Sequence, residues 1–153
     1  MRLEPKDLYE KLEFDKVLQL VEKECLGAPG QAFVQNLPLL TDKPLIEQQL
    51  DEVAECKLAG EQGDPLPIAP YEDLSEDLRM LEIEDYVLPG DGWKRINNVL
   101  LVTGALFRFF NPDRQKAFPT LYDILRPVDF DETLAEAIDR VYDENGEIRP
   151  GAN

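Results

Sequence analysis

Six basic side chains within residues 91–126 are the part of this sequence best suited to contact a phosphate group. The chain of 153 residues carries a formal net charge of −16, whereas this segment has six basic and only three acidic side chains. Aromatic residues lie among the basic ones, and surfaces that bind single-stranded nucleic acids combine these two kinds of side chain. The sequence therefore predicts a weak nucleic-acid contact, formed by Lys94, Arg95, Arg108, Arg114 and Lys116, with Arg126 as the sixth basic residue of the segment.

Two plainer interpretations of residues 91–126 stay open. The basic residues also suit solvated positions on helix faces, where Lys and Arg are normally found. The aromatic residues Trp93, Phe107 and Phe110 recur at helical spacing, which is typical of a stripe that packs in a core. The acidic remainder of the chain repels phosphate backbones, so we do not expect strong nucleic-acid binding by this chain alone.

The absence of histidine narrows the possible enzyme classes. It excludes Ser-His-Asp and Cys-His catalysis, H-E-x-x-H zinc sites and imidazole pH switches. The two cysteines, Cys25 and Cys56, lie at the apolar edges of helical patterns, so we expect buried, inert free thiols. Two thiols without other soft ligands do not make a structural zinc site.

Two turns resemble ligand-binding loops without matching them. Gly90-Asp91-Gly92 precedes a helix, but a dinucleotide fingerprint requires a third glycine where this sequence has Arg95, and no strand precedes the turn. Asp143-Glu144-Asn145-Gly146 lacks the ligand spacing of a calcium loop. No phosphate-loop motif occurs. We therefore predict no catalytic, cofactor-binding or metal-binding residue in residues 1–153.

Helices must position these residues, because apolar side chains recur at steps of three and four nearly everywhere. A short helix is expected from Pro5 to Leu12, and proline and glycine residues mark 60–70 as a connector. Thr41 or Asp42, Asp91, and Asp129 or Asp131 are the expected N-caps. Short helices are also expected at 31–36 and 118–125, and longer ones at 14–25, 42–60, 71–83, 93–110 and 131–141. The last of them should bury Leu134, Ala137, Ile138 and Val141.

These segments predict an all-α fold, an irregular bundle of about seven helices. Asn145-Gly146 indicates a turn, and residues 147–149 could begin a return strand. The chain has no apolar run of the roughly 20 residues needed to cross a bilayer, and no secretory signal is visible at its start. We therefore expect a cytoplasmic protein that does not enter a membrane.

Several stretches of the chain resemble the bacterial MutS-II family, the MutS paralogues that usually end in a small MutS-related (Smr) nuclease domain. The first runs from Glu10 to Val17 and reads E-K-L-E-F-D-K-V. It is followed by the turn from Cys25 to Gly30. Further agreement, in order and spacing, covers the helix from Glu47 to Leu58, the long helix after Leu88-Pro89-Gly90, and the stretch from Phe118-Pro119-Thr120-Leu121 to Ile148.

The resemblance implies that residues 1–153 are the N-terminal helical core or lever region of a larger protein, truncated before the clamp helices. The family's Ala-Ser pair at the start of the clamp would correspond to Ala152-Asn153, where Asn153 departs from the pattern. The implied parent is a dimeric, ATP-driven protein that binds branched or duplex DNA. Family roles are suppression of homologous recombination and rescue of collided ribosomes. ATP and Mg²⁺ would bind to later domains, so no functional residue of the family is carried over to this chain.

A second interpretation comes from a different class of protein. The chain could be a free-standing acidic helical adaptor that binds a protein partner through an apolar groove. A phosphate loop encoded downstream would favour the lever, whereas a natural end after Asn153 would favour the adaptor.

Overall fold

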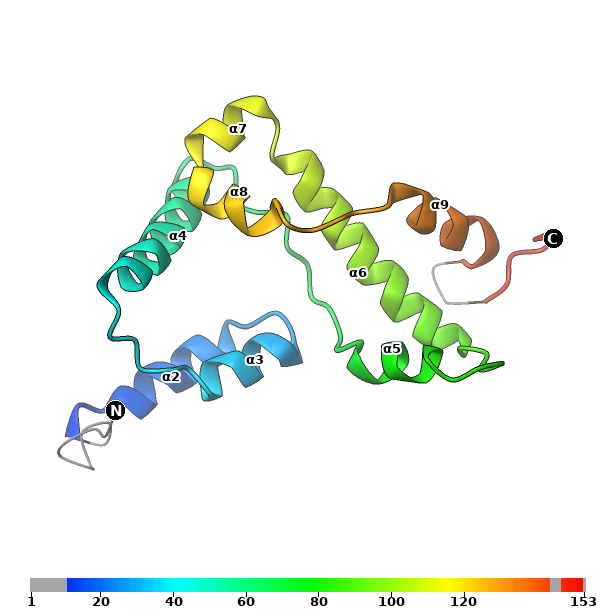
Figure 1. The fold of residues 1–153 in the computed structure, drawn as a ribbon, viewed down its shortest axis with the longest axis horizontal. Coiled ribbons are helices and arrows are strands. Elements are labelled where there is room, and N and C mark those ends of the chain that lie inside the picture. Colours follow the sequence, from blue (N-terminus) through cyan, green and yellow to red (C-terminus); the bar gives the residue numbers. More distant parts are fainter. Residues whose placement is uncertain (1–10, 144–146, 153) are drawn as a thin grey trace. The chain divides into compact units, whose positions relative to one another are not determined.

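The computed structural model describes residues 11–143 and 147–152, and this part of the chain is all-α, as predicted. Figure 1 shows the helices. Their bounds are α2 Phe14–Lys23, α3 Ala28–Gln35, α4 Lys43–Glu61, α5 Ser75–Leu81, α6 Gly90–Phe109, α7 Pro112–Ala117, α8 Pro119–Leu125 and α9 Glu132–Val141. The expected helix at 5–12 and the Asn145-Gly146 turn lie wholly or mostly outside the described residues.

The chain divides into two compact units. The first contains α2 and α3 with the segment Pro70–Asp73, and the second contains Leu40–Ala69 and everything after Asp73. In the first unit α3 begins at Ala28, three residues earlier than expected, because Gly27 is extended and Pro29 fits a first helical turn. The amide of Gln35 donates to the carboxylate of Glu22 over 2.6 Å, which joins α3 to α2.

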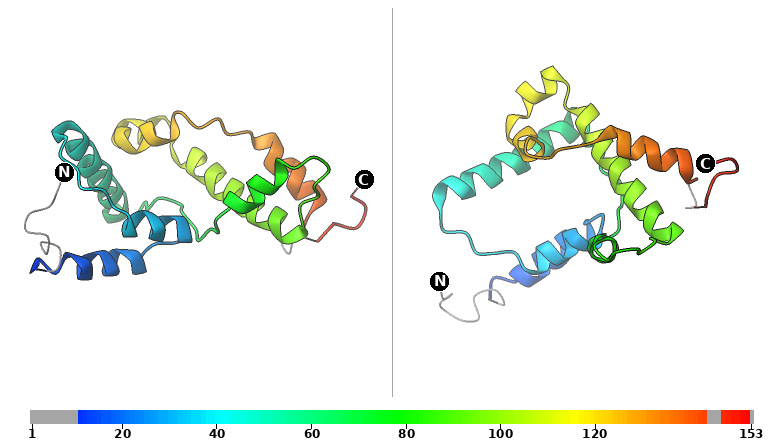
Figure 2. Two further views of the ribbon diagram at one scale, coloured as in Figure 1. Left: turned by 60° about the horizontal axis from the view of Figure 1, so that its bottom comes forward. Right: turned by 45° about the vertical axis from the view of Figure 1, so that its right-hand side comes forward.

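An aromatic cluster forms where α4, α8 and the end of α6 meet in the second unit. Its buried members are Ala59, Phe109, Phe110 and Phe118. The rings of Phe109 and Phe110 meet edge to face with centroids 5.1 Å apart, and Phe109 stacks on Phe118 at 6.5 Å. Figure 2 shows α8 beside α4 in both views. Such aromatic pairs stabilise a fold beyond the burial of their surface area. This cluster therefore helps to hold the C-terminal end of α6 against α4 and α8.

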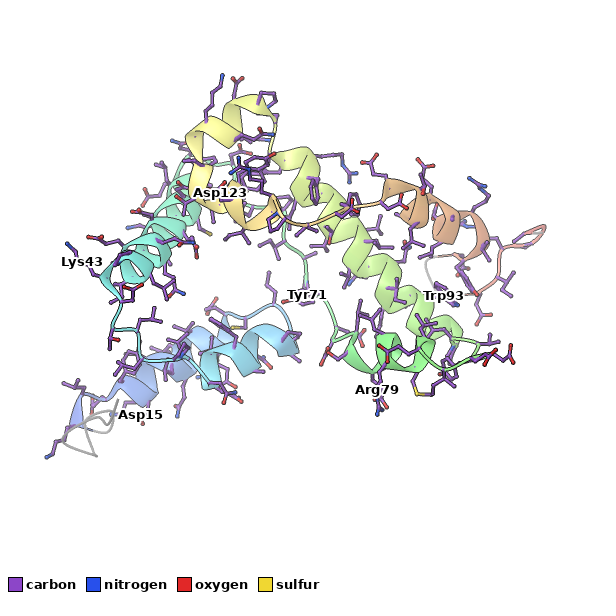
Figure 3. The ribbon with its side chains drawn as sticks, in the orientation of Figure 1. Asp15, Lys43, Tyr71, Arg79, Trp93 and Asp123 are labelled. Atoms are coloured by element: carbon purple, nitrogen blue, oxygen red, sulfur yellow. The ribbon has the colours of Figure 1, made fainter. Side chains whose placement is uncertain are left out.

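An aliphatic cluster forms at the other end of α6, where Leu88, Ile96 and Ile138 are buried. Trp93 packs against it and stacks on Tyr142 with ring centroids 5.5 Å apart. Trp93, labelled near the start of α6 in Figure 3, is half-buried, which agrees with the interpretation that the aromatic residues form a packed stripe. The cluster holds α9 against the N-terminal half of α6.

Several helix ends differ from the sequence prediction. The helix expected at 71–83 is only α5, because residues 71–74 form a loop. Pro89, not Asp91, is the N-cap residue of α6. The short helix α7 was not predicted; Asn111 caps it by accepting from the backbone N–H groups of Asp113 and Arg114. The connector at 60–70 is loop after Glu61, where α4 ends.

The predictions near the C-terminus are confirmed in part. Asp131 is the N-cap of α9, and its carboxylate accepts from the N–H of Thr133 at 2.8 Å. Hydrogen bonds from the hydroxyl and backbone of Thr133 lower the pKa of Asp131. The return strand is reduced to one antiparallel bridge between Tyr142 and Ile148.

Several predicted apolar faces are open to solvent. Leu134 and Ala137 of α9 are exposed, and so are Val17 and Val21 of α2. The expectation of buried thiols was wrong: both cysteines are free, but Cys56 is exposed and Cys25 is only half-buried. The physical reason is that each of these helices packs on one neighbour, which covers only part of its apolar stripe. In the described part of the chain, no helix is both long and apolar enough to span a membrane.

Candidate nucleic-acid interface

Arg95 lies in the first half of α6 and makes an ion pair with Asp77 of α5. Its Nε donates to Oδ2 over 2.8 Å and its Nη2 donates to Oδ1 over 2.7 Å, which is the bidentate arrangement that Arg favours. The Arg95 hydrogen bonds hold the pKa of Asp77 below its ordinary value, although burial of the carboxylate acts in the opposite direction. Asp77 is buried, so this pair ties α5 to α6 and directs the guanidinium inward.

Arg114 of α7 is engaged in the same way with Asp64, which lies in the connector after α4. Its Nε and Nη2 donate to the two carboxylate oxygens over 2.6 and 2.7 Å. Its Nη1 donates to the carbonyl oxygen of Phe109 over 3.0 Å, and its Cζ lies 4.3 Å from the centroid of the Phe109 ring. Arg114 therefore contributes to the aromatic cluster through an ion pair and a cation–π contact.

The other three residues of the predicted contact are exposed, and they make no ion pair within residues 11–143 and 147–152. They are Lys94, Arg108 and Lys116. Lys94 and Arg108 lie 14 positions apart on α6, or roughly 21 Å along its axis. Arg126 pairs with Asp123, labelled on α8 in Figure 3, at 2.9 Å. The geometry thus spreads Lys94 and Arg108 along α6, and the nucleic-acid contact itself stays a prediction.

Glu55 is a residue whose role the sequence analysis did not find. Its Oε1 accepts from the N–H of Thr120 over 3.1 Å and its Oε2 accepts from the N–H of Leu121 over 2.9 Å. A carboxylate of α4 therefore caps the N-terminus of α8, where backbone N–H groups have no partner within the helix. The sequence signal for such a cap was indirect. Phe118 is the N-cap residue of α8 and its side chain cannot accept a hydrogen bond, so a cap must come from another part of the chain.

A groove between α6 and α9 was also missed. Leu100, Leu101, Gly104 and Arg108 form its α6 side. Phe130, Glu132, Ala135, Glu136 and Asp139 form the opposite side, and the volume is about 290 Å³. The floor is mainly apolar, whereas carboxylates line the α9 edge. The sequence showed each half as an ordinary amphipathic helix and gave no sign that the two halves would leave a space between them.

Comparison with known proteins confirms the resemblance seen in the sequence. The chain is 29% identical to endonuclease MutS2 of Lactococcus lactis subsp. lactis over 97% of its own length and 19% of that protein. It is 33% identical to endonuclease MutS2 of L. lactis subsp. cremoris over 76% of its length and 15% of that protein. It is 31% identical to endonuclease MutS2 of Gemmatimonas aurantiaca over 93% of its own length and 18% of that protein. The chain thus spans less than a fifth of the length of these curated relatives. No protein-family model and no solved structure matches it.

Proposed function

Because the chain is a relative of the bacterial MutS-II proteins over most of its length, we propose that it is the N-terminal helical lever region of such a protein. In this proposal the chain has no catalytic site of its own. It transmits movement between other domains, or holds them in position, within a larger DNA-binding ATPase that works as a dimer in the cytoplasm. The parent would suppress recombination or rescue ribosomes.

The alignment carries this proposal: nearly the whole chain matches a small share of each relative. The exposed apolar side chains agree with it. Leu50 and Val53 of α4 are mostly exposed although they belong to its apolar face, and Val17 and Val21 on the apolar face of α2 are about half exposed. Apolar surface of this kind marks sites of interaction with other protein segments. Further domains of the parent would cover these faces.

ATP and Mg²⁺ would be held elsewhere in the parent, since this sequence contains no phosphate-loop motif. DNA would also be gripped elsewhere. Arg95 and Arg114, the two arginines with bidentate partners, already neutralise Asp77 and Asp64, and a net charge of −16 opposes an approaching phosphate backbone.

We expect no duplex binding by the 153-residue chain at micromolar concentration and about 150 mM salt. A gel-shift titration measures this directly. Micromolar binding that is lost in the double variant Lys94→Glu with Lys116→Glu would contradict the expectation, because both side chains are exposed and their replacement leaves the core intact.

A chimera tests the lever proposal itself. The matched segment of the L. lactis endonuclease MutS2 is replaced by this chain, and DNA cleavage is compared with that of the native relative and of a variant lacking the segment. We expect the chimera to cleave DNA and the deletion variant to lose activity. A folded chimera as inactive as the deletion variant would contradict the proposal, and so would ATP turnover by the 153-residue chain alone.

The groove between α6 and α9 favours a second candidate, an acidic helical adaptor for a protein partner. It has an apolar floor and exposed carboxylates at its edge, which is the chemistry of a peptide-binding surface. The two candidates differ in the chimera experiment, because a free-standing adaptor has no reason to restore cleavage to a nuclease.

A further inference from the structure

The groove between α6 and α9 has one firmly held wall. Phe130 stacks on Phe107 of α6 with ring centroids 5.2 Å apart. A Cβ at Gly104 would lie 3.1 Å from Cζ of Phe130, so the ring packs directly against the backbone of α6. Because Phe130 is held by both contacts, this wall of the groove is in place before a ligand binds.

The size of the groove suits side chains better than a nucleotide or a large cofactor. Its volume of about 290 Å³ lies just below the range of roughly 300–1,000 Å³ that small-molecule sites occupy. A cavity of about 150 Å³ is enough for a benzene molecule. The groove could therefore accept one or two large apolar side chains between Leu101 and Phe130.

The charges at the edge of the groove are mostly negative. Glu132 and Glu136 of α9 are exposed, and neither makes an ion pair within the described residues. Asp139, the third carboxylate, is paired with Arg149 at 2.9 Å. Arg108 is the single cation on the α6 side. Two free carboxylates one helical turn apart match cationic side chains spaced three or four residues apart on a docked helix.

We propose that this groove binds a basic amphipathic helix of a partner protein. Large apolar residues of that helix would insert between Leu101 and Phe130, and its Lys or Arg residues would face Glu132 and Glu136. The apolar contacts would supply affinity, and the charges would set orientation and exclude acidic helices. This inference rests on the adaptor candidate and names the class of its partner, and it does not depend on the lever proposal.

Fluorescence anisotropy of a labelled 14-residue peptide tests the inference. The probe is a synthetic amphipathic helix of Leu and Lys, and the matched control replaces every Lys by Glu. The protein is the whole 153-residue chain at about 150 mM salt, with circular dichroism to check that each variant is folded. We expect the Lys peptide to bind with a micromolar Kd and the Glu peptide to bind at least tenfold more weakly.

Two pairs of variants separate docking in the groove from general attraction to an acidic protein. Leu101→Lys should weaken binding at least tenfold, whereas Leu78→Lys on α5 should change Kd less than twofold. The two leucines are 56% and 54% exposed, so both changes fall on the surface and add the same charge. Glu132→Gln with Glu136→Gln should weaken binding threefold or more, and Glu82→Gln with Glu84→Gln should not.

Three results would overturn the inference. One is a failure of the Lys peptide to bind more tightly than the Glu peptide at concentrations up to about 100 µM. Another is an equal loss of affinity in Leu101→Lys and Leu78→Lys, which would place the peptide elsewhere on the surface. The last is an equal loss in the two pairs of Glu→Gln changes, which would show attraction to net charge alone.

Discussion

Each end of α6 packs in an apolar cluster with an Arg–Asp ion pair beside it, but the two ends differ in how much each kind of contact contributes. The aromatic cluster at the C-terminal end has Arg114 and Asp64 at its edge, and the aliphatic cluster at the N-terminal end has Arg95 and Asp77. The side chain of Asp64 is 41% exposed, whereas that of Asp77 is only 11% exposed. The two arginines are about equally exposed, 32% for Arg114 and 30% for Arg95, so the difference between the two ion pairs lies in the burial of the carboxylate.

The comparison shows how a small helical unit compensates for a limited core. Ring stacking and burial supply most of the contacts at one end of α6, and Arg114 adds an ion pair and a cation–π contact at their edge. At the other end a bidentate ion pair joins α5 to α6 with a defined side-chain geometry. Loss of a ring should therefore damage the first end most, and loss of a carboxylate should damage the second.

The largest effect is expected for Phe118→Ala in the aromatic cluster. Phe118 is 2% exposed, so truncation leaves a cavity and should lower the free energy of unfolding by about 3–5 kcal/mol. Chemical denaturation measures the change. Phe33→Ala is the matched control, because Phe33 is 61% exposed and its loss should cost less than about 0.5 kcal/mol. Equal losses for both variants would mean that the aromatic cluster is not the main core.

The next effect is expected for Gly92→Ala at the aliphatic cluster. A Cβ at Gly92 would lie 2.7 Å from Cγ of Leu88, which is itself buried. Overpacking of this kind costs about 1–3 kcal/mol, and the better helix propensity of alanine, about 1 kcal/mol, offsets part of it. Gly60→Ala in α4 should instead stabilise the fold, because a Cβ there meets nothing within 4 Å. Thermal melting shows whether each variant has a lower or a higher melting temperature than the native chain. A higher melting temperature for Gly92→Ala would show that Leu88 moves aside easily.

A smaller difference is expected between the two ion pairs. Asp77→Asn keeps an oxygen that accepts one hydrogen bond from Arg95 but removes the charge, so the melting temperature should fall. Asp64→Asn should lower it less, because water already screens the more exposed pair. A larger fall in melting temperature for Asp64→Asn than for Asp77→Asn would contradict the distinction between the buried and the exposed carboxylate.

The smallest effect is a dependence of stability on pH. Because the pKa of Asp77 is lowered in the folded chain, its contribution is complete above the unfolded-state pKa of about 3.9. The contribution is lost as the pH falls through the lower pKa of the folded state. The difference in melting temperature between the native chain and Asp77→Asn should therefore shrink below about pH 4. A difference that stays constant with pH would show that packing, not ionisation, carries the effect of Asp77.

The sequence was sufficient for elements that are encoded locally. The period of three to four residues predicted α2, α4, α6 and α9, and Asp131 was among the two predicted caps of α9. The same period could not predict which apolar faces find a partner, so Leu134 was expected to be buried and is exposed.

Arg95 and Arg114, two residues of the predicted nucleic-acid contact, form ion pairs with distant partners. Arg95 and Asp77 are 18 positions apart, and Arg114 and Asp64 are 50 apart. No local pattern links residues over such separations, and a basic residue that pairs inward has the same local sequence as one that faces solvent. The groove between α6 and α9 has the same origin, because neither helix defines it alone.

The cap that Glu55 provides for α8 has a consequence for the order of folding. α8 has only seven residues, too few to be stable as an isolated helix, and its cap comes from a residue 65 positions earlier in the chain. The loop between them must close before the cap can form, and loop closure has an entropic cost. α8 should therefore become ordered late, after α4 is in place. Glu55→Gln should then accelerate unfolding while leaving the rate of folding nearly unchanged, which stopped-flow kinetics would show.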